Sequence, residues 1–155
     1  VAMVTSALAE AGLPPQRLEL EVTETALLDD SEATIEILHQ LRALGVRVSL
    51  DDFGVGYSSL SYLRKFPFDR IKIDRSFVGT LGESPESVAI VRTIASLGSV
   101  LGVETTAEGV ETEEQLDFVR ECGCTAVQGY YFGRPCPAAE VARTIETLNA
   151  VRRVA

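Results

Sequence analysis

The chain has 155 residues, of which 46% are hydrophobic and 24% are charged, and its net charge is −9. These values fit one globular domain with a sizeable core and exclude a disordered chain. The acidic balance also excludes general binding to nucleic acid, which needs a basic surface, but it does not exclude a small phosphate ligand held through bridging cations.

Helix-like and strand-like patterns alternate along the chain. Apolar residues recur every three or four positions in the expected helices, at 1–11, 31–44, 58–66, 84–101, 112–123 and 137–151. The expected strands cover 18–22, 46–50, 70–74, 103–107 and 126–128. Such alternation predicts a parallel α/β sheet covered by helices. Five strands fit either a complete open sheet or the later part of a (β/α)8 barrel, which typically needs about 250 residues.

The cysteines and the lack of a long apolar run indicate the cellular setting. Cys122, Cys124 and Cys136 are the only cysteines, and their spacing contains no C-x-x-C pair. Neither a disulfide framework nor a zinc site is therefore expected, and a reducing, cytoplasmic location is favoured. No apolar run reaches the length of a membrane span.

Polar side chains lie at or just beyond the end of every predicted strand. They are Glu21, Glu24, Asp51, Asp52, Lys72, Asp74, Glu108, Glu111 and Gln128. The carboxyl ends of parallel strands share one edge, where α/β proteins bind their ligands. One acid at a strand end is most often a helix cap or a surface charge, but the whole set indicates a functional site. Asp51 and Asp52 are adjacent and repel each other, so we expect a cation beside them.

This set of side chains favours metal-assisted hydrolysis. Hard cations such as Mg²⁺ and Mn²⁺ prefer carboxylate oxygens, and a pair of them can clamp the attacking and leaving oxygens of a phosphodiester. A lysine beside the metals can stabilise negative charge or position a water, and a further carboxylate can take a proton. Gly54 and Gly56 follow the acid pair and form either a simple turn or a mobile loop over the site.

Other chemistries fit the sequence less well. The only histidine, His39, lies within a helix pattern, so a Ser-His-Asp triad or a histidine-based zinc site is not expected. The chain also lacks a G-x-G-x-x-G fingerprint and a P-loop lysine.

Five short motifs carry a resemblance to a known family. They are Glu21-Val22-Thr23-Glu24, Asp51-Asp52-Phe53-Gly54-Val55-Gly56-Tyr57-Ser58-Ser59-Leu60, Lys72-Ile73-Asp74-Arg75-Ser76-Phe77, Ala107-Glu108-Gly109-Val110-Glu111-Thr112 and Gln128-Gly129-Tyr130. In order and spacing they resemble EAL domains, the bacterial cyclic-di-GMP phosphodiesterases, and the resemblance extends from about Gly12 to Pro137. It implies the later five β/α units of a TIM-like (β/α)8 barrel that opens cyclic di-GMP to linear pGpG.

The resemblance also implies roles for the residues nearest the reaction. Glu21, Asp51 and Asp52 would bind two Mg²⁺ or Mn²⁺ ions, with Asp51 as the bridge. Lys72 would lie beside the nucleophilic water, and Glu108 is similar to the family's general base.

Further residues would act around this centre. Gln128 would help hold the water network or the ligand, Glu111 would support the site, and Asp74 would lie on the substrate side. Glu24 would anchor the loop of Gly54 and Gly56, which in this family couples metal binding to dimerisation. The implied partners are cyclic di-GMP, a second copy of the chain, and GGDEF or sensory domains in the full-length protein.

The chain also departs from the family pattern. The Glu-Ala-Leu signature and a strand bearing a metal-ligating asparagine are absent, and both would precede Val1. We therefore expect residues 1–155 to be one partial domain without its first three strands, which either is inactive alone or completes its sheet with another chain. Val55 stands where a threonine is usual, and Thr105-Thr106 replaces an apolar pair.

Two other functions fit parts of the sequence. The first is a degenerate EAL domain that binds cyclic di-GMP as a sensor without hydrolysing it. The second is a receiver-like domain that uses Asp51 or Asp52 for Mg²⁺ and phosphate together with Lys72, although receiver domains lack the motif from Ala107 to Thr112.

Overall fold

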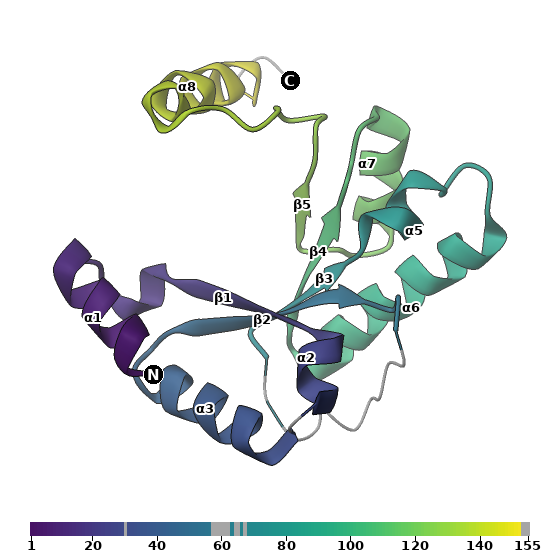
Figure 1. Cartoon of the computed structure of the whole chain (residues 1–155). Helices are drawn as coiled ribbons and strands as arrows, with labels where there is room; N and C mark the ends of the chain where they lie inside the picture. Colours follow the sequence, from purple (N-terminus) through teal and green to yellow (C-terminus); the bar gives the residue numbers. More distant parts are fainter. Residues whose placement is uncertain (30, 57–62, 64–65, 67, 153–155) are drawn as a thin grey trace.

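The computed structural model describes residues 1–29, 31–56, 63, 66 and 68–152, and these residues contain one five-stranded sheet (Figure 1). Its strands are β1 (Glu19–Thr23), β2 (Arg47–Phe53), β3 (Arg70–Ile73), β4 (Glu104–Glu108) and β5 (Ala126–Gln128). Every neighbouring pair is parallel, and the spatial order β1-β2-β3-β4-β5 is the order in the chain.

Helices connect the strands. The α-helices are α1 (Ala2–Ala11), α2 (Glu24–Asp29), α3 (Ser31–Ala43), α5 (Arg75–Gly79), α6 (Pro85–Leu101), α7 (Glu113–Glu121) and α8 (Val141–Arg152). Two short 3-10 turns, η1 (Pro15–Arg17) and η2 (Ala138–Glu140), precede β1 and α8. None of the helices among the described residues combines the length and the apolar character needed to cross a membrane.

The sequential strand order decides between the predicted architectures. Parallel crossovers are right-handed almost without exception, so strands that follow one another without a reversal place all their helices on one face. This is the arrangement of a (β/α)8 barrel wall, as predicted. A receiver-like sheet would have the strand order 2-1-3-4-5, and the observed order excludes it.

The face of the sheet that the helices cover is apolar. Val48, Leu50, Ile71, Ile73 and Ala107 are buried in one core cluster. The same cluster contains Leu38 from α3, Val91 and Ile94 from α6, and Leu116 and Val119 from α7. Burial of this surface is the main contribution to the stability of the sheet.

The opposite face of the sheet is polar and contains two groups of charged residues. The group at the amino ends of the strands, the arginine layer, consists of Glu19, Arg47, Arg70 and Glu104. Glu104 Oε2 lies 2.8 Å from Arg47 Nη2 and 2.5 Å from Arg70 Nη2. Glu19 Oε1 lies 3.0 Å from Arg70 Nη1 and Glu19 Oε2 lies 3.6 Å from Arg47 Nε, so each arginine pairs with an acid of β1 and an acid of β4. Hydrogen bonds from both arginines hold the pKa of Glu104 below its ordinary value.

Thr105 shows how a polar residue is accommodated on the covered face of β4. Its backbone N–H donates to Thr125 Oγ1 at 2.8 Å, and the Thr125 hydroxyl donates to the Thr105 carbonyl at 3.0 Å. Its methyl group packs against Gly98 of α6, where an added Cβ would lie 2.3 Å from Thr105 Cγ2. At Thr105 the departure from the family pattern is therefore matched by the hydroxyl of Thr125 and by a glycine of α6.

Several helix boundaries follow from caps that the sequence shows. Ser84 accepts from the backbone of Ser87 with Pro85 at the first helical position, and Thr112 forms a capping box with Gln115. The short helices α2 and α5 were not predicted, because each follows its strand directly, without an intervening loop. The helix predicted over 58–66 falls almost wholly outside the described residues.

We expect Glu104→Gln to lower the free energy of unfolding at pH 7 by up to about 1 kcal/mol, a value limited by the exposure of the ion pairs. Because the folded-state pKa of Glu104 is lowered, its contribution is fully present above the unfolded-state pKa and is lost as the pH falls through the folded-state pKa. Urea unfolding of both proteins should therefore differ at pH 7 and converge in acid.

The control is Glu121→Gln, at the exposed end of α7, which should leave stability unchanged at either pH. An equal loss for Glu104→Gln at pH 7 and at pH 3 would show that the arginine layer contributes through packing and not through charge.

Candidate functional site

A buried lysine stands at the centre of the polar side chains near the carboxyl ends of the strands. Lys72 Nζ lies 2.7 Å from Glu21 Oε1, 3.0 Å from Asp51 Oδ1 and 2.8 Å from Glu108 Oε1. These four residues, the lysine cluster, come from β1, β2, β3 and β4. Residues predicted as metal ligands, water-positioning lysine and general base are thus brought together by the sheet.

Strand register explains this convergence. Glu21 pairs with Ser49 and Lys72 pairs with Thr106, so these positions share the polar face of the sheet. Side chains alternate between faces along a strand, and Asp51 and Glu108 lie two residues further along the same face. The lysine therefore extends toward the strand ends and meets all three carboxylates.

The electrostatic balance of the cluster keeps the lysine charged. Burial alone would lower the pKa of Lys72, but hydrogen bonds to Glu108, Glu21 and Asp51 outweigh it and raise the pKa above its ordinary value. The ammonium thereby neutralises part of the mutual repulsion among the three acids.

Asp51 and Asp52 lie within an irregularity at the end of β2. The pairing register between β2 and β3 shifts between Leu50 and Phe53, and Asp52 adopts a positive φ of 54°. Strict alternation would point Asp52 into the helix-covered core and Phe53 away from it. The shift leaves Asp52 exposed and buries Phe53, so both side chains lie in suitable surroundings.

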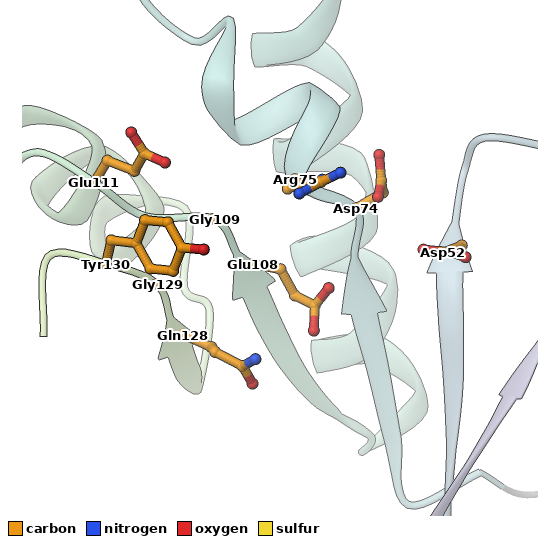
Figure 2. A pocket seen from close by; sticks show the side chains of 9 residues that line it. All are labelled: Asp52, Asp74, Arg75, Glu108, Gly109, Glu111, Gln128, Gly129 and Tyr130. Carbon is orange, nitrogen blue, oxygen red and sulfur yellow. The ribbon is translucent and has the colours of Figure 1, made fainter. Parts of the chain in front are cut away.

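A cavity of about 480 Å³ opens beside the cluster at the ends of β2 to β5 (Figure 2). The residues that line it are Asp52, Asp74, Arg75, Glu108, Gly109, Glu111, Gln128, Gly129 and Tyr130. Glu108 belongs to both the cavity and the lysine cluster. Burial, Asp51 and Asp74 together raise the pKa of Asp52, which indicates that this end of the cavity is rich in negative charge.

Asp74 has a structural role in addition to lining the cavity. Its carboxylate caps α5 by accepting from the backbone N–H and the hydroxyl of Ser76. Burial opposes ionisation of Asp74, but these hydrogen bonds outweigh it, so its pKa lies below the ordinary value.

Glu24 lies under the glycine loop that follows Asp52. The side chain is buried, and a Cβ added at Gly56 would lie only 3.3 Å from Glu24 Oε2. Gly54 has a φ of 100°, and its neighbour across the loop is Phe77. The close approach between Glu24 and Gly56 places the predicted anchor beside its predicted loop.

The carboxylates of the lysine cluster are the type of ligand that a hard metal ion prefers, but in this structure they surround the Lys72 ammonium. Asp51 Oδ1 is buried and has no hydrogen-bond partner among the described residues apart from the ammonium 3.0 Å away. Displacement of the ammonium would leave this oxygen able to bind a divalent cation. Within the described ranges, no group of three or more acids, histidines or cysteines is arranged so that it could hold a metal ion as it stands. The reason is that Lys72 lies between the carboxylates, so a divalent ion would have to displace the ammonium from Glu21 and Asp51.

The structure also reveals cavity residues that were not singled out from the sequence. Arg75 and Tyr130 follow Asp74 and Gln128 within quoted motifs, but the pattern assigns them no role. The sequence feature that could have identified these two residues is their position just beyond predicted strands.

The chain is similar in sequence to proteins of one known family. The EAL domain family model matches residues 1–135. The cyclic di-GMP phosphodiesterase NbdA of Pseudomonas aeruginosa is 50% identical over 136 residues, which make up 88% of this chain and 17% of NbdA. The chain therefore spans less than a fifth of the length of this relative.

The fold of the chain is also similar to that of solved structures from the same family. The PaMucR phosphodiesterase in complex with c-di-GMP matches with a TM-score of 0.86 and 46% identity, covering 89% of this chain and 56% of that chain. BlrP1 of Klebsiella pneumoniae, in a manganese/cy-diGMP complex, matches with a TM-score of 0.81 and 37% identity, covering 87% of this chain and 34% of that chain. A further BlrP1 complex holds calcium and cy-diGMP.

We expect Lys72→Met to destabilise the metal-free protein by about 2 to 3 kcal/mol. This is less than the loss of a fully buried ion pair, because Glu21 is half exposed. Mn²⁺ should raise the melting temperature of this variant more than that of the wild type. In the variant the ion supplies the missing positive charge, whereas in the wild type it must first displace the Lys72 ammonium. Thermal melts with and without MnCl₂ measure both effects.

Arg92→Met removes a cation from α6, outside the cluster, and should respond to Mn²⁺ as the wild type does. If Mn²⁺ raised the melting temperature of Lys72→Met no more than that of wild type, Lys72 would not compete with the ion.

Proposed function

Because this chain belongs to the EAL domain family, we propose that it contributes active-site residues to a metal-dependent phosphodiesterase that hydrolyses cyclic di-GMP to linear pGpG. The observation that carries the proposal is the lysine cluster, in which one ammonium lies within 3.0 Å of carboxylates from three other strands. The relatives' names and complexes supply the substrate class.

The acids beside Lys72 would hold the metal. Glu21, Asp51 and Asp52 offer carboxylate oxygens that suit Mg²⁺ or Mn²⁺. When bound, such ions lower the pKa of a water and polarise the phosphodiester. The bend at Asp52 directs its carboxylate to the cavity while Asp51 stays with Lys72, so the pair presents oxygens to both regions.

The reaction adds one water across a phosphodiester of the ring. The water oxygen forms a bond to phosphorus, the bond from phosphorus to the 3′-oxygen breaks, and the product keeps a 5′-phosphate. Glu108 accepts the proton of the water, and the departing 3′-oxygen takes up a proton to become a hydroxyl. Lys72, 2.8 Å from Glu108, orients this carboxylate and offsets negative charge as it develops on the phosphoryl oxygens.

The remaining predicted residues would hold the ligand or the loop. Gln128, Asp74 and Glu111 line the cavity beside Glu108 and offer polar contacts to a nucleotide. Glu24 would hold the loop of Gly54 and Gly56 in place, as their close packing supports.

Further proposals concern the setting of the enzyme. We place it in the cytoplasm, where its substrate acts as a second messenger, and the three cysteines are free, as a reducing compartment allows. We also propose that the protein assembles into a homodimer and is linked to GGDEF or sensory domains, as the resemblance to the family implies.

We expect Asp51→Asn to reduce pGpG formation by at least about a hundredfold, because a carboxylate that would hold the divalent cations loses its charge. The assay is chromatography of the products from the full-length protein with cyclic di-GMP and Mg²⁺ or Mn²⁺, and EDTA should abolish the reaction.

Asp117→Asn is the matched control, since among the described residues Asp117 pairs only with Arg120, on the exposed face of α7, and the change should leave the rate unaltered. Wild-type protein that binds cyclic di-GMP without releasing pGpG would be a sensor and would contradict the proposed hydrolysis.

A further inference from the structure

The hydroxyl of Thr106, on β4, is buried without a hydrogen-bond partner among the described residues. Only 5% of the residue is exposed, and its Oγ1 atom makes no hydrogen bond within the described part of the chain. The adjacent hydroxyl of Thr105 differs, since it accepts from the Thr125 backbone N–H at 3.4 Å. A buried polar group without a partner costs free energy, so the Thr106 hydroxyl is expected to find its partner in another state of the protein.

Strand register places Thr106 beside the lysine cluster. Thr106 pairs directly with Lys72 of β3, and Glu108 follows it by two residues, so all three side chains lie on the polar face of the sheet. Ser49 lies on the same face of β2, but its hydroxyl already donates to the Leu20 carbonyl at 3.5 Å. Of these two hydroxyls, that of Thr106 therefore remains available to the lysine.

The Lys72 ammonium has one N–H group for each carboxylate that surrounds it. Its Nζ lies 2.7 Å from Glu21, 3.0 Å from Asp51 and 2.8 Å from Glu108, and an ammonium has three donors. A divalent ion bound to Glu21 and Asp51 would leave only the contact with Glu108, and two N–H groups would lose their acceptors. Because Lys72 is buried, these N–H groups need new acceptors on the same face of the sheet.

We propose that Thr106 is a positioning residue, which accepts a hydrogen bond from the Lys72 ammonium once a divalent ion has displaced it from the carboxylates of β1 and β2. This inference rests on the metal binding of the proposed function. The Thr106 oxygen has lone pairs for an N–H of the displaced ammonium. Lys72 then lies between Thr106 and Glu108, both on β4, and stays beside the carboxylate that takes the proton of the water.

The hydroxyl thereby reduces the cost of metal binding. An ammonium that moves to a waiting acceptor loses less than one whose buried N–H groups stay unpaired, so the ion binds more tightly when the hydroxyl is present. In the metal-free protein Thr106 Oγ1 makes no hydrogen bond with the described residues. Its contribution therefore belongs to the metal-bound state.

The test is calorimetric titration of the full-length protein with MnCl₂. Thr106→Val, which replaces the hydroxyl by a methyl group, should weaken Mn²⁺ binding about tenfold, the effect of one hydrogen bond to a charged group. Thr106→Ser keeps the hydroxyl and should bind Mn²⁺ as the wild type does. Without metal, the melting temperature of Thr106→Val should not fall, because an apolar group replaces a hydroxyl that has no partner among the described residues.

Thr105→Val is the matched control, since it makes the same change one residue earlier, on the face of β4 that packs against Gly98 of α6, and should leave Mn²⁺ binding unchanged. A second control removes the lysine. In a Lys72→Met protein, adding Thr106→Val should not alter Mn²⁺ binding, because no ammonium is left to accept from.

The outcomes separate the inference from the function on which it rests. Equal Mn²⁺ affinity of Thr106→Val and wild type would overturn the role of Thr106 and leave the proposed phosphodiesterase intact. The role would be overturned as well by a lowered melting temperature without metal, or by an equal loss of Mn²⁺ affinity in the Lys72→Met protein. Wild-type protein that binds no Mn²⁺ would contradict the proposed function and the inference with it.

Discussion

The site depends on the ammonium of Lys72, which lies between carboxylates from three other strands. Without a cation at this point, Glu21, Asp51 and Glu108 would repel one another across the sheet. The same contacts explain why the acids can be gathered before any metal is bound, and why a metal must compete for them. Structure, charge balance and proposed chemistry thus converge on one side chain.

A division of the sheet into two faces makes this arrangement possible. The helix-covered face is apolar and supplies the burial that stabilises the fold. The other face is polar along its length, with the arginine layer near the amino ends of the strands and the lysine cluster near their carboxyl ends. The irregularity at Asp52 preserves the difference between the two faces, because it keeps a second acid out of the core while Phe53 remains in it. The cavity residues then extend the polar face into a ligand site.

Much of this could be predicted from the sequence because it depends on local pattern. Alternating strands and helices gave the parallel sheet, and acids near strand ends gave Glu21, Asp51 and Glu108 as neighbours of Lys72. The irregularity at the end of β2 could not be predicted, because the sequence indicates a regular alternation of side chains between the two faces through Asp52. The sequence assigned Arg75 and Tyr130 no role, because their places in the cavity depend on close backbone contacts at Gly109 and Gly129 between segments far apart in the chain.

The most direct test of the account is the anomalous scattering of manganese from crystals of the protein grown with Mn²⁺. The account predicts manganese bound to Asp51 and Glu21, with Lys72 Nζ displaced from both carboxylates and still beside Glu108. Manganese bound elsewhere, or no manganese at Asp51 while Lys72 keeps all three carboxylates, would contradict it.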